Sequence, residues 1–196
     1  MTTAALDTAL WALGRGTGVV ALLMFTVSLV LGVFTRSGRP LPGLGRFAAS
    51  DLHRTAALTG TLLVGVHVMS LFFDSYAQLR LVDLVIPFLG AAKPLWLGLG
   101  TLAVDLLAVI TVVSLLRHRV GPRVFKAVHF GTYLLWPIAL VHAIGTGTDA
   151  LTPWLLGLAA ACTAAVVGAV GWRLTPSFIE RGWSRSSRVL PHQRSN

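Results

Sequence analysis

The sequence is poor in charge and in cysteine. Only 12% of its 196 residues are charged and 55% are hydrophobic, whereas a soluble domain carries about 25% charged residues. A chain with so little charge cannot cover a water-facing surface, so lipid is its natural solvent. The one cysteine, Cys162, cannot form a disulfide within the chain, and the sequence has no CxxC motif. We therefore expect no cysteine-ligated zinc or iron–sulfur centre.

Acidic residues are especially scarce. Seven Asp and Glu stand against 16 Lys and Arg, which gives a formal net charge of +9. Such an excess can indicate nucleic-acid binding, but here the basic residues fall in short gaps between apolar runs, which is typical of membrane topology. We therefore expect no nucleic-acid partner. The run 17–34 is long for the apolar core of a signal peptide and no small-residue cleavage site follows it, so we expect a retained transmembrane helix.

Long apolar segments are abundant instead. A membrane-spanning helix needs roughly 20 apolar residues, and five segments qualify. They are approximately 12–34, 52–74, 94–116, 124–146 and 153–173. The segment 78–92 is apolar but short and carries Arg80 and Asp83, so it predicts an interfacial or re-entrant helix. The expected fold class is all-α, an integral membrane helical bundle in lipid, with a membrane domain over 1–175 and a basic, disordered cytoplasmic tail over 176–196.

The positions of Lys and Arg predict the orientation of the bundle, because cytoplasmic loops carry an excess of both. Thirteen basic residues fall on one side of the predicted spans, and three, Arg15, Arg80 and Lys93, fall on the other. The thirteen are Arg36, Arg39, Arg46, Arg54, Arg117, Arg119, Arg123, Lys126, Arg173, Arg181, Arg185, Arg188 and Arg194. We therefore expect a multi-pass protein of the cell membrane with its N-terminus outside and its C-terminus in the cytoplasm.

Four of the six histidines lie within predicted spans, two on the second and two on the fourth. An ionisable residue inside a membrane is costly and usually functional, although a single histidine there can also be a packing hydrogen bond. Along a helix, His67 lies ~21 Å from His53 and only ~40° from the same direction. His142 lies ~20 Å from His129 but about 140° away, and Pro137 between them can kink the helix or admit a π-bulge that changes the register.

The two histidine pairs have matching depths, because both helices enter from the cytoplasmic side in the predicted topology. His53 and His129 should lie near the inner surface, and His67 and His142 near the outer one. Each level then offers one imidazole from each of two helices, which is what a six-coordinate haem iron requires. Two haems would divide an electron path across the ~30 Å hydrocarbon core into feasible steps.

These histidines resemble those of a known family. Paired histidines at these spacings, on helices separated by one intervening helix, look like the ferric-reductase-like transmembrane domain, over roughly residues 12–173. That domain occurs in ferric reductases and NADPH oxidases, and a related haem subunit serves the bacterial periplasmic methionine-sulfoxide reductase. The resemblance implies transmembrane electron transfer. It also implies an inner haem b ligated by His53 and His129 and an outer haem b ligated by His67 and His142, with these four as the iron ligands.

The chain departs from the family pattern in two respects. It has five predicted spans where many members have six, and about 23 residues follow the last span without a GxGxxG fingerprint for a nicotinamide nucleotide. We therefore expect a membrane oxidoreductase subunit that needs a separate electron donor, either a flavin reductase or a quinol. On the outer side, ferric iron, oxygen, a periplasmic reductase protein and quinone all remain open as the acceptor.

Several charged residues could serve the predicted haems. Arg54, Arg123 and Lys126 lie close to the inner histidines and could pair with haem propionates, or they could reflect positive-inside topology alone. Asp105 lies inside the third span and could hydrogen-bond a partner helix or carry protons to a quinone site. The sequence does not decide between these alternatives.

Aromatic residues and glycines add weaker signals. Phe130, Tyr133 and Trp136 lie between the histidines of the fourth span and could contact a macrocycle, although ordinary packing explains them more simply. Gly60 could let a flat cofactor approach the backbone. A GxxxG pair at 14–18 favours close helix packing.

Two other functional classes remain open. The same histidines could line a metal or proton transporter, although transporters often show inverted repeats and broken helices near mid-membrane, whereas these histidines sit at two depths and no repeat is visible. The chain could also be a membrane anchor in which the histidines only pack. His118 and His192 lie in a loop and in the tail, and we expect neither to be a ligand.

Overall fold

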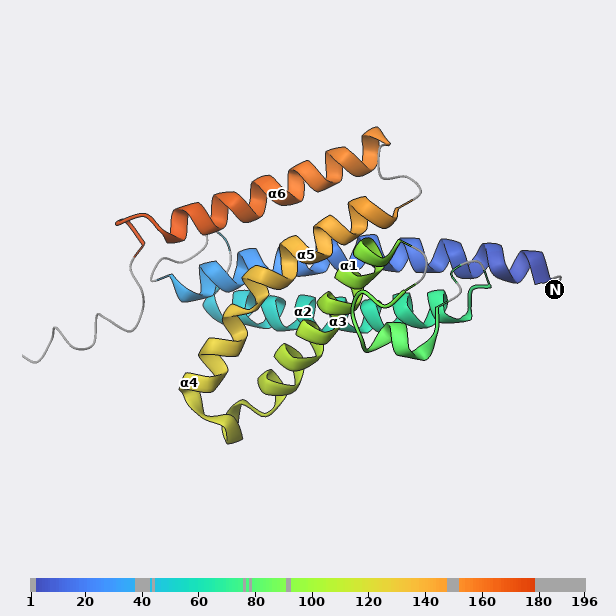
Figure 1. The fold of residues 1–196 in the computed structure, drawn as a ribbon. Helices are drawn as coiled ribbons and strands as arrows, with labels where there is room; N and C mark the ends of the chain where they lie inside the picture. The colour runs from blue at the N-terminus through green and yellow to red at the C-terminus, as the bar shows by residue number, and fades with distance from the viewer. Residues whose placement is uncertain are drawn as a thin grey trace, which may run out of the picture.

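The computed structural model describes residues 3–37, 43, 45–75, 77, 79–90, 93–147 and 152–178. Figure 1 shows that the described chain forms a bundle of helices. These are α1 (Thr3–Arg36), α2 (Arg46–Phe73), the 3-10 helix η1 (Leu81–Leu84), α3 (Pro94–Leu115), α4 (Arg117–Phe130), α5 (Thr132–Thr146) and α6 (Pro153–Arg173). Pro94 and Pro153 stand at the first positions of α3 and α6, where the missing N–H of proline costs no helical hydrogen bond.

Five helical stretches of the described chain are long and apolar enough to cross a membrane. They are Ala5–Arg36, Arg46–Phe73, Pro94–Leu115, Arg117–Thr146 and Pro153–Arg173. Large apolar side chains such as Leu62 and Val167 are 70% and 63% exposed on the outside of the bundle, a surface that suits lipid. The predicted all-α integral membrane bundle is thereby confirmed, and the protein is a multi-pass membrane protein.

Some details differ from the sequence-based expectation. The second spanning helix begins at Arg46, ahead of the expected residue 52. In 79–90, the described part of the expected helix at 78–92, the helical stretch is the single turn of η1. Arg80 and Asp83 pair with each other across this turn. Most of the tail predicted over 176–196 lies outside the described residues.

Small residues allow α1 and α2 to pack closely along their length, and Figure 1 shows the two helices side by side. Gly14 of α1 lies against Leu71 of α2, and Gly60 of α2 lies against Phe25 of α1. Ala21 and Ala56 are also buried. Small residues at a membrane helix interface let the two backbones approach. This close approach brings α1 backbone within reach of the α2 histidines.

Two buried clusters hold the other helices. One joins α1, α5 and α6 through residues that include Leu29, Trp136 and Val166, and the other joins α3 to α5 through residues that include Leu107 and Leu135. The Trp136 indole N–H donates to the Thr26 hydroxyl at 2.9 Å, so the one polar atom of this large side chain is satisfied inside the core.

The fourth span is kinked at Gly121, where φ is 78° and ψ is 159°. Between the two histidines it is interrupted by a turn at Gly131 and not at Pro137. The Gly131 N–H donates to Val128 O at 2.9 Å, a tight three-residue bond. Gly131 O accepts both from Leu134 N–H at 3.0 Å and, in the regular helical way, from Leu135 N–H at 2.8 Å. α5 continues as helix through Pro137. The change of direction between α4 and α5, visible in Figure 1, corrects the expectation that the proline causes the break.

Candidate functional site

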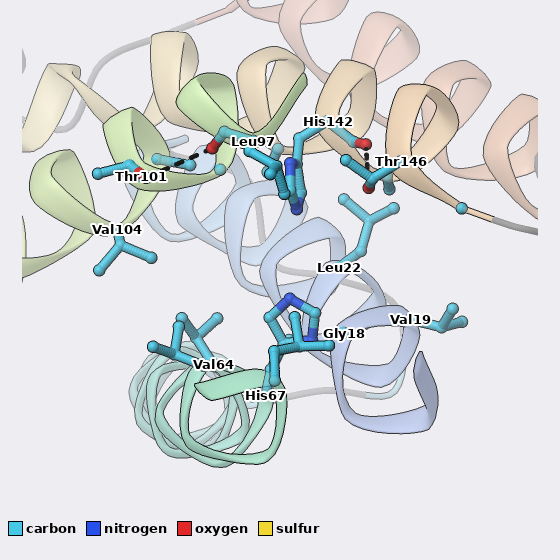
Figure 2. A pocket seen from close by; sticks show the side chains of 18 of the residues that line it. Gly18, Val19, Leu22, Val64, His67, Leu97, Thr101, Val104, His142 and Thr146 are labelled. Atoms are coloured by element: carbon cyan, nitrogen blue, oxygen red, sulfur yellow. Dashed lines mark hydrogen bonds between the residues drawn. The ribbon is translucent and has the colours of Figure 1, made fainter. Parts of the chain in front are cut away.

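The four intramembrane histidines form two pairs in the structure. The ring centroids of His53 and His129 lie 6.1 Å apart, with their planes at 76°. The ring centroids of His67 and His142 lie 6.4 Å apart, with their planes at 85°. In Figure 2, His67 and His142 approach from opposite sides of a gap, and a nitrogen of each ring faces the other ring.

The two ring separations fit a haem iron. At a metal–nitrogen distance of about 2.0 Å, two imidazoles on opposite sides of one metal have ring centroids about 6.3 Å apart. The observed separations of 6.1 and 6.4 Å bracket that value. Within the described residues there is no group of three or more His, Cys, Asp or Glu side chains around a common point, and a porphyrin-bound iron needs only two protein ligands.

Backbone carbonyls orient three of the four imidazoles. The Nδ1–H of His67 donates to Gly14 O at 2.7 Å, and that of His142 donates to Trp96 O at 2.8 Å. His53 donates in the same way to Ser28 O at 2.7 Å. A carbonyl can only accept, so each Nδ1 carries the proton and each Nε2 keeps its lone pair. This tautomer is the one that a metal-binding histidine with an Nδ1 hydrogen bond adopts.

His129 differs from the other three. Its Nδ1 is buried and has no hydrogen-bond partner among the described residues. Its ring instead stacks on Phe125 of the same helix, with centroids 5.2 Å apart and planes at 21°. The pair formed with His53 therefore has one imidazole held by a carbonyl and one held by an aromatic ring.

A largely apolar cavity surrounds the His67–His142 pair. α1, α2, α3 and α5 all contribute to its lining, and its apolar side chains include Leu22, Val64 and Leu107. Figure 2 shows Gly18 close to His67 on this wall. A flat cofactor with an apolar macrocycle would find matching surroundings here, with water largely excluded.

A few polar groups also line the same cavity. Arg15 and Asp83 are among its lining residues, together with Thr101 and Thr146. The hydroxyls of Thr101 and Thr146 donate to backbone oxygens, those of Asp83 and His142 respectively. The lining thus combines a mostly apolar surface with a few polar groups, a combination that is common in cofactor sites.

Phe25 is a residue that the sequence reading missed. It packs directly on Gly60, where an added Cβ would lie 2.9 Å from Phe25 Cε1. Gly60 stands seven residues from both His53 and His67, so this ring fills the space between the two levels. Small residues and this one aromatic residue recur at helical spacing on α1, and that pattern could have indicated the contact. The sequence alone, however, does not tell which face of α1 meets α2.

The cations proposed for propionate binding lie on the surface. Arg54, Arg123 and Lys126 are all exposed, and the Lys126 ammonium lies 5.9 Å from the ring centroid of Phe130. Their role in haem binding stays a prediction. Asp105 is half-buried on α3, and its two alternative roles stay open.

The aromatics of the fourth span are engaged in packing. Trp136 lies in the core with α1 and α6. The guanidinium of Arg173, at the end of α6, lies 4.9 Å from the ring centroid of Phe130 and 5.6 Å from that of Tyr133, and it donates a hydrogen bond to the Tyr133 hydroxyl. These contacts tie α6 to the α4–α5 junction. Of the other histidines, His118 is exposed and His192 lies outside the described residues.

Comparison with known proteins identifies the family. No curated protein and no solved structure matches the chain. A family model described as ferric reductase like transmembrane component matches residues 17–140. The match includes His53, His67 and His129, and it ends two residues before His142. Because this match covers more than half of the sequence, the chain belongs to the ferric reductase like transmembrane family.

Proposed function

We propose that this chain is a transmembrane electron-transfer subunit that binds two b-type haems. Its family in general transfers electrons across membranes and binds haem. The finer proposal is that His53 and His129 ligate an inner haem and that His67 and His142 ligate an outer one. The observation that carries it is the separation of both ring pairs, 6.1 and 6.4 Å, at the value required by one iron between two imidazoles.

Bound haem would supply a one-electron Fe(III)/Fe(II) couple at each level. The chain's own residues hold the ligands and control their surroundings. Carbonyls of α1 and α3 fix His53, His67 and His142 with Nε2 free to bind iron. The cavity around His67 and His142 has a mostly apolar lining, and the polarity around a haem tunes its potential. With no CxxCH motif in the sequence, non-covalent b-type haem is the form that suits the chain.

The charge distribution supports a membrane orientation, and the proposed direction of transfer rests on that orientation. Thirteen of the 16 Lys and Arg lie on the side of the inner pair in the proposed topology, so this side is assigned to the cytoplasm. The donor is proposed to be a separate flavin reductase or a quinol on that side. The acceptor is proposed to be ferric iron or a protein on the outer side. Residues 1–175 would be the haem-binding membrane domain and 176–196 a basic cytoplasmic tail.

The visible spectrum of protein purified from haem-replete cells tests this function. We expect a reduced b-type α-band and two haems per chain by the pyridine haemochrome assay. His67→Ala should lose the outer haem and keep the inner one, and His118→Ala, which changes an exposed histidine, should keep both. Protein without haem would reject electron transfer in favour of a histidine-lined metal or proton transporter, and one haem per fully loaded chain would reject the two-site arrangement.

A further inference from the structure

A repeated arrangement surrounds the histidines that are held by backbone carbonyls. Each carbonyl lies on a neighbouring helix, and in each case the residue four positions further along that helix is glycine. The carbonyls belong to Gly14, Ser28 and Trp96. The glycines are Gly18, Gly32 and Gly100. The arrangement occurs twice on α1 and once on α3.

Helix geometry explains why a glycine is needed there. The Cα–Cβ bond of a helical residue points toward the N-terminus, so its side chain covers the turn before it. That turn carries the carbonyl four residues back, which accepts the N–H of the covering residue. A side chain at this position therefore shields the carbonyl from a neighbouring helix. Glycine leaves the second lone pair of the carbonyl oxygen open to an approaching imidazole.

The clearances show that the imidazoles occupy the space that side chains would fill. A Cβ at Gly100 would lie 2.5 Å from His142 Cε1 and 2.7 Å from its Nδ1. A Cβ at Gly18 would lie 3.0 Å from His67 Nδ1. These distances are shorter than van der Waals contact, so the ring would have to move away from the carbonyl.

The inner site is slightly less tight. A Cβ at Gly32 would lie 3.2 Å from His53 Cε1 and 3.4 Å from its Nδ1. An added methyl here would displace the ring by only a few tenths of an ångström. The three positions thus form a graded series, with Gly100 the most restrictive and Gly32 the least.

We propose that Gly18, Gly32 and Gly100 are positioning residues for the haem ligands. Each uncovers a carbonyl that fixes the tautomer and direction of one histidine and strengthens the histidine as a donor to iron. This inference rests on the proposed function. A hydrogen bond from the Nδ1–H raises the basicity of a ligating imidazole, and stronger donation stabilises ferric over ferrous iron. Loss of the carbonyl contact should therefore raise the midpoint potential of the haem concerned.

The two haem sites differ in this respect. The His67–His142 pair has a carbonyl for each imidazole, whereas in the other pair His53 has one and His129 has none among the described residues. Each glycine therefore acts on one haem only. Helix packing is the competing explanation for the glycines, and it predicts general loss of stability without a shift confined to one haem.

Redox titration of two purified variants, Gly100→Ala and Gly32→Ala, tests the proposal, with Gly65→Ala as the control. Gly65 lies on α2, and an added Cβ there would meet nothing within 4 Å. We expect Gly100→Ala to raise the midpoint potential of the outer haem, or to release that haem, while the inner haem keeps its potential. Gly32→Ala should raise the potential of the inner haem alone. Gly65→Ala should match the parent.

The possible contrary results point to different conclusions. If Gly100→Ala and Gly32→Ala keep both haems at the parent potentials, or if either one shifts both haems equally, the positioning role is wrong. If Gly100→Ala does not accumulate, the milder Gly32→Ala carries the test. A parent protein without haem would reject the proposed function itself, whereas a parent with two haems and unchanged glycine variants would reject only this inference.

Discussion

The imidazole planes of His67 and His142 stand at 85° to each other across the gap between α2 and α5. The planes of His53 and His129 make a similar angle of 76°. When two axial imidazoles are perpendicular, each interacts with a different iron d orbital of π symmetry, so these orbitals stay close in energy. The ring orientations are therefore a property that spectroscopy can detect.

The first prediction follows from these angles. Each of the two proposed haems, once oxidised, should give the highly anisotropic low-spin EPR signal, with one large g value, that near-perpendicular imidazole ligands produce. Low-temperature EPR of the ferric protein measures this, and His67→Ala assigns the outer signal by its disappearance. Rhombic signals of the kind produced by parallel planes would contradict the ring orientations found here.

A second prediction concerns the buried contact between Trp136 and Thr26. Thr26→Val keeps the side-chain shape but leaves the indole N–H without its acceptor, and an unpaired buried donor costs about 1 to 3 kcal/mol. We expect a corresponding fall in thermal stability in detergent. Thr61→Val is the matched control, because Thr61 donates only to Ala57 O one turn back in its own helix. Equal stability of the two variants would mean that the indole finds another partner.

Sequence reasoning located the spans well because span length and apolar composition are set by the membrane itself. It also grouped His53 with His67 on one helix face, since a regular helix fixes their relative direction. It misplaced the break between the histidines of the fourth span. Pro137 is recognisable in a sequence as a helix breaker, whereas the turn at Gly131 is defined by local hydrogen bonds that the sequence does not show. Proline can be accommodated in a membrane helix when neighbours compensate for the lost bond.

The hydrogen-bond partners of the histidines were beyond sequence reasoning for a different reason. Whether Gly14 O or Trp96 O faces an imidazole depends on the rotation of two helices about their axes. The GxxxG pair at 14–18 was visible, but it indicated only close packing. The proposed role of Gly18 beside His67 depends on a distance in the structure, the 3.0 Å between an added Cβ at Gly18 and His67 Nδ1.

A third prediction concerns pH and the turn beside the cavity that holds His67 and His142. Arg80 donates to both carboxylate oxygens of Asp83, at 2.8 and 3.0 Å, and these hydrogen bonds lower the pKa of Asp83 below its usual value. Because the pKa is lower in the folded state, the pair stabilises the turn above the unfolded pKa of about 4. That contribution is lost as pH falls through the lower, folded value.

Hydrogen exchange or limited proteolysis of the segment 79–90 measures this effect. Asp83→Asn should open the segment at neutral pH to the extent seen in the parent under strong acid, and acid should then add little. Asp51→Asn, at an exposed carboxylate of α2, is the control and should behave as the parent does. A segment equally protected in Asp83→Asn and parent would show that the ion pair does not hold the turn.

A fourth prediction concerns orientation in the membrane. The excess of Lys and Arg on the side of Arg46 and Arg117 predicts that the loops there and the C-terminus are cytoplasmic. A C-terminal reporter that works only in the cytoplasm should be active, and the same reporter in the segment 79–90 should be silent. The reverse pattern would invert the orientation and exchange the inner and outer haem assignments.

The last prediction concerns the electron donor and the exposed basic residues of α4, which we call the α4 basic surface. It consists of Arg117, Arg119, Arg123 and Lys126. A donor protein with an acidic face would be attracted to it, and charge attraction of this kind raises association rates by about 10-fold or more at low salt. Since screening shortens the Debye length from ~10 Å at 0.1 M to ~3 Å at 1 M salt, the rate of haem reduction should fall as salt rises. NAD(P)H alone should not reduce the protein.

Stopped-flow reduction by a flavin reductase, with a charge-neutralised variant, separates the possibilities. Arg117→Gln combined with Arg119→Gln removes two charges that are not proposed to touch haem, and it should slow reduction several-fold at low salt and little at high salt. Lys93→Gln, an exposed cation on the opposite side, is the control and should leave the rate unchanged. A rate independent of salt in parent and double variant alike would reject electrostatic docking while keeping the separate donor. Fast reduction by NAD(P)H without a partner would reject the separate donor, because the chain would then have to take electrons from the nucleotide directly.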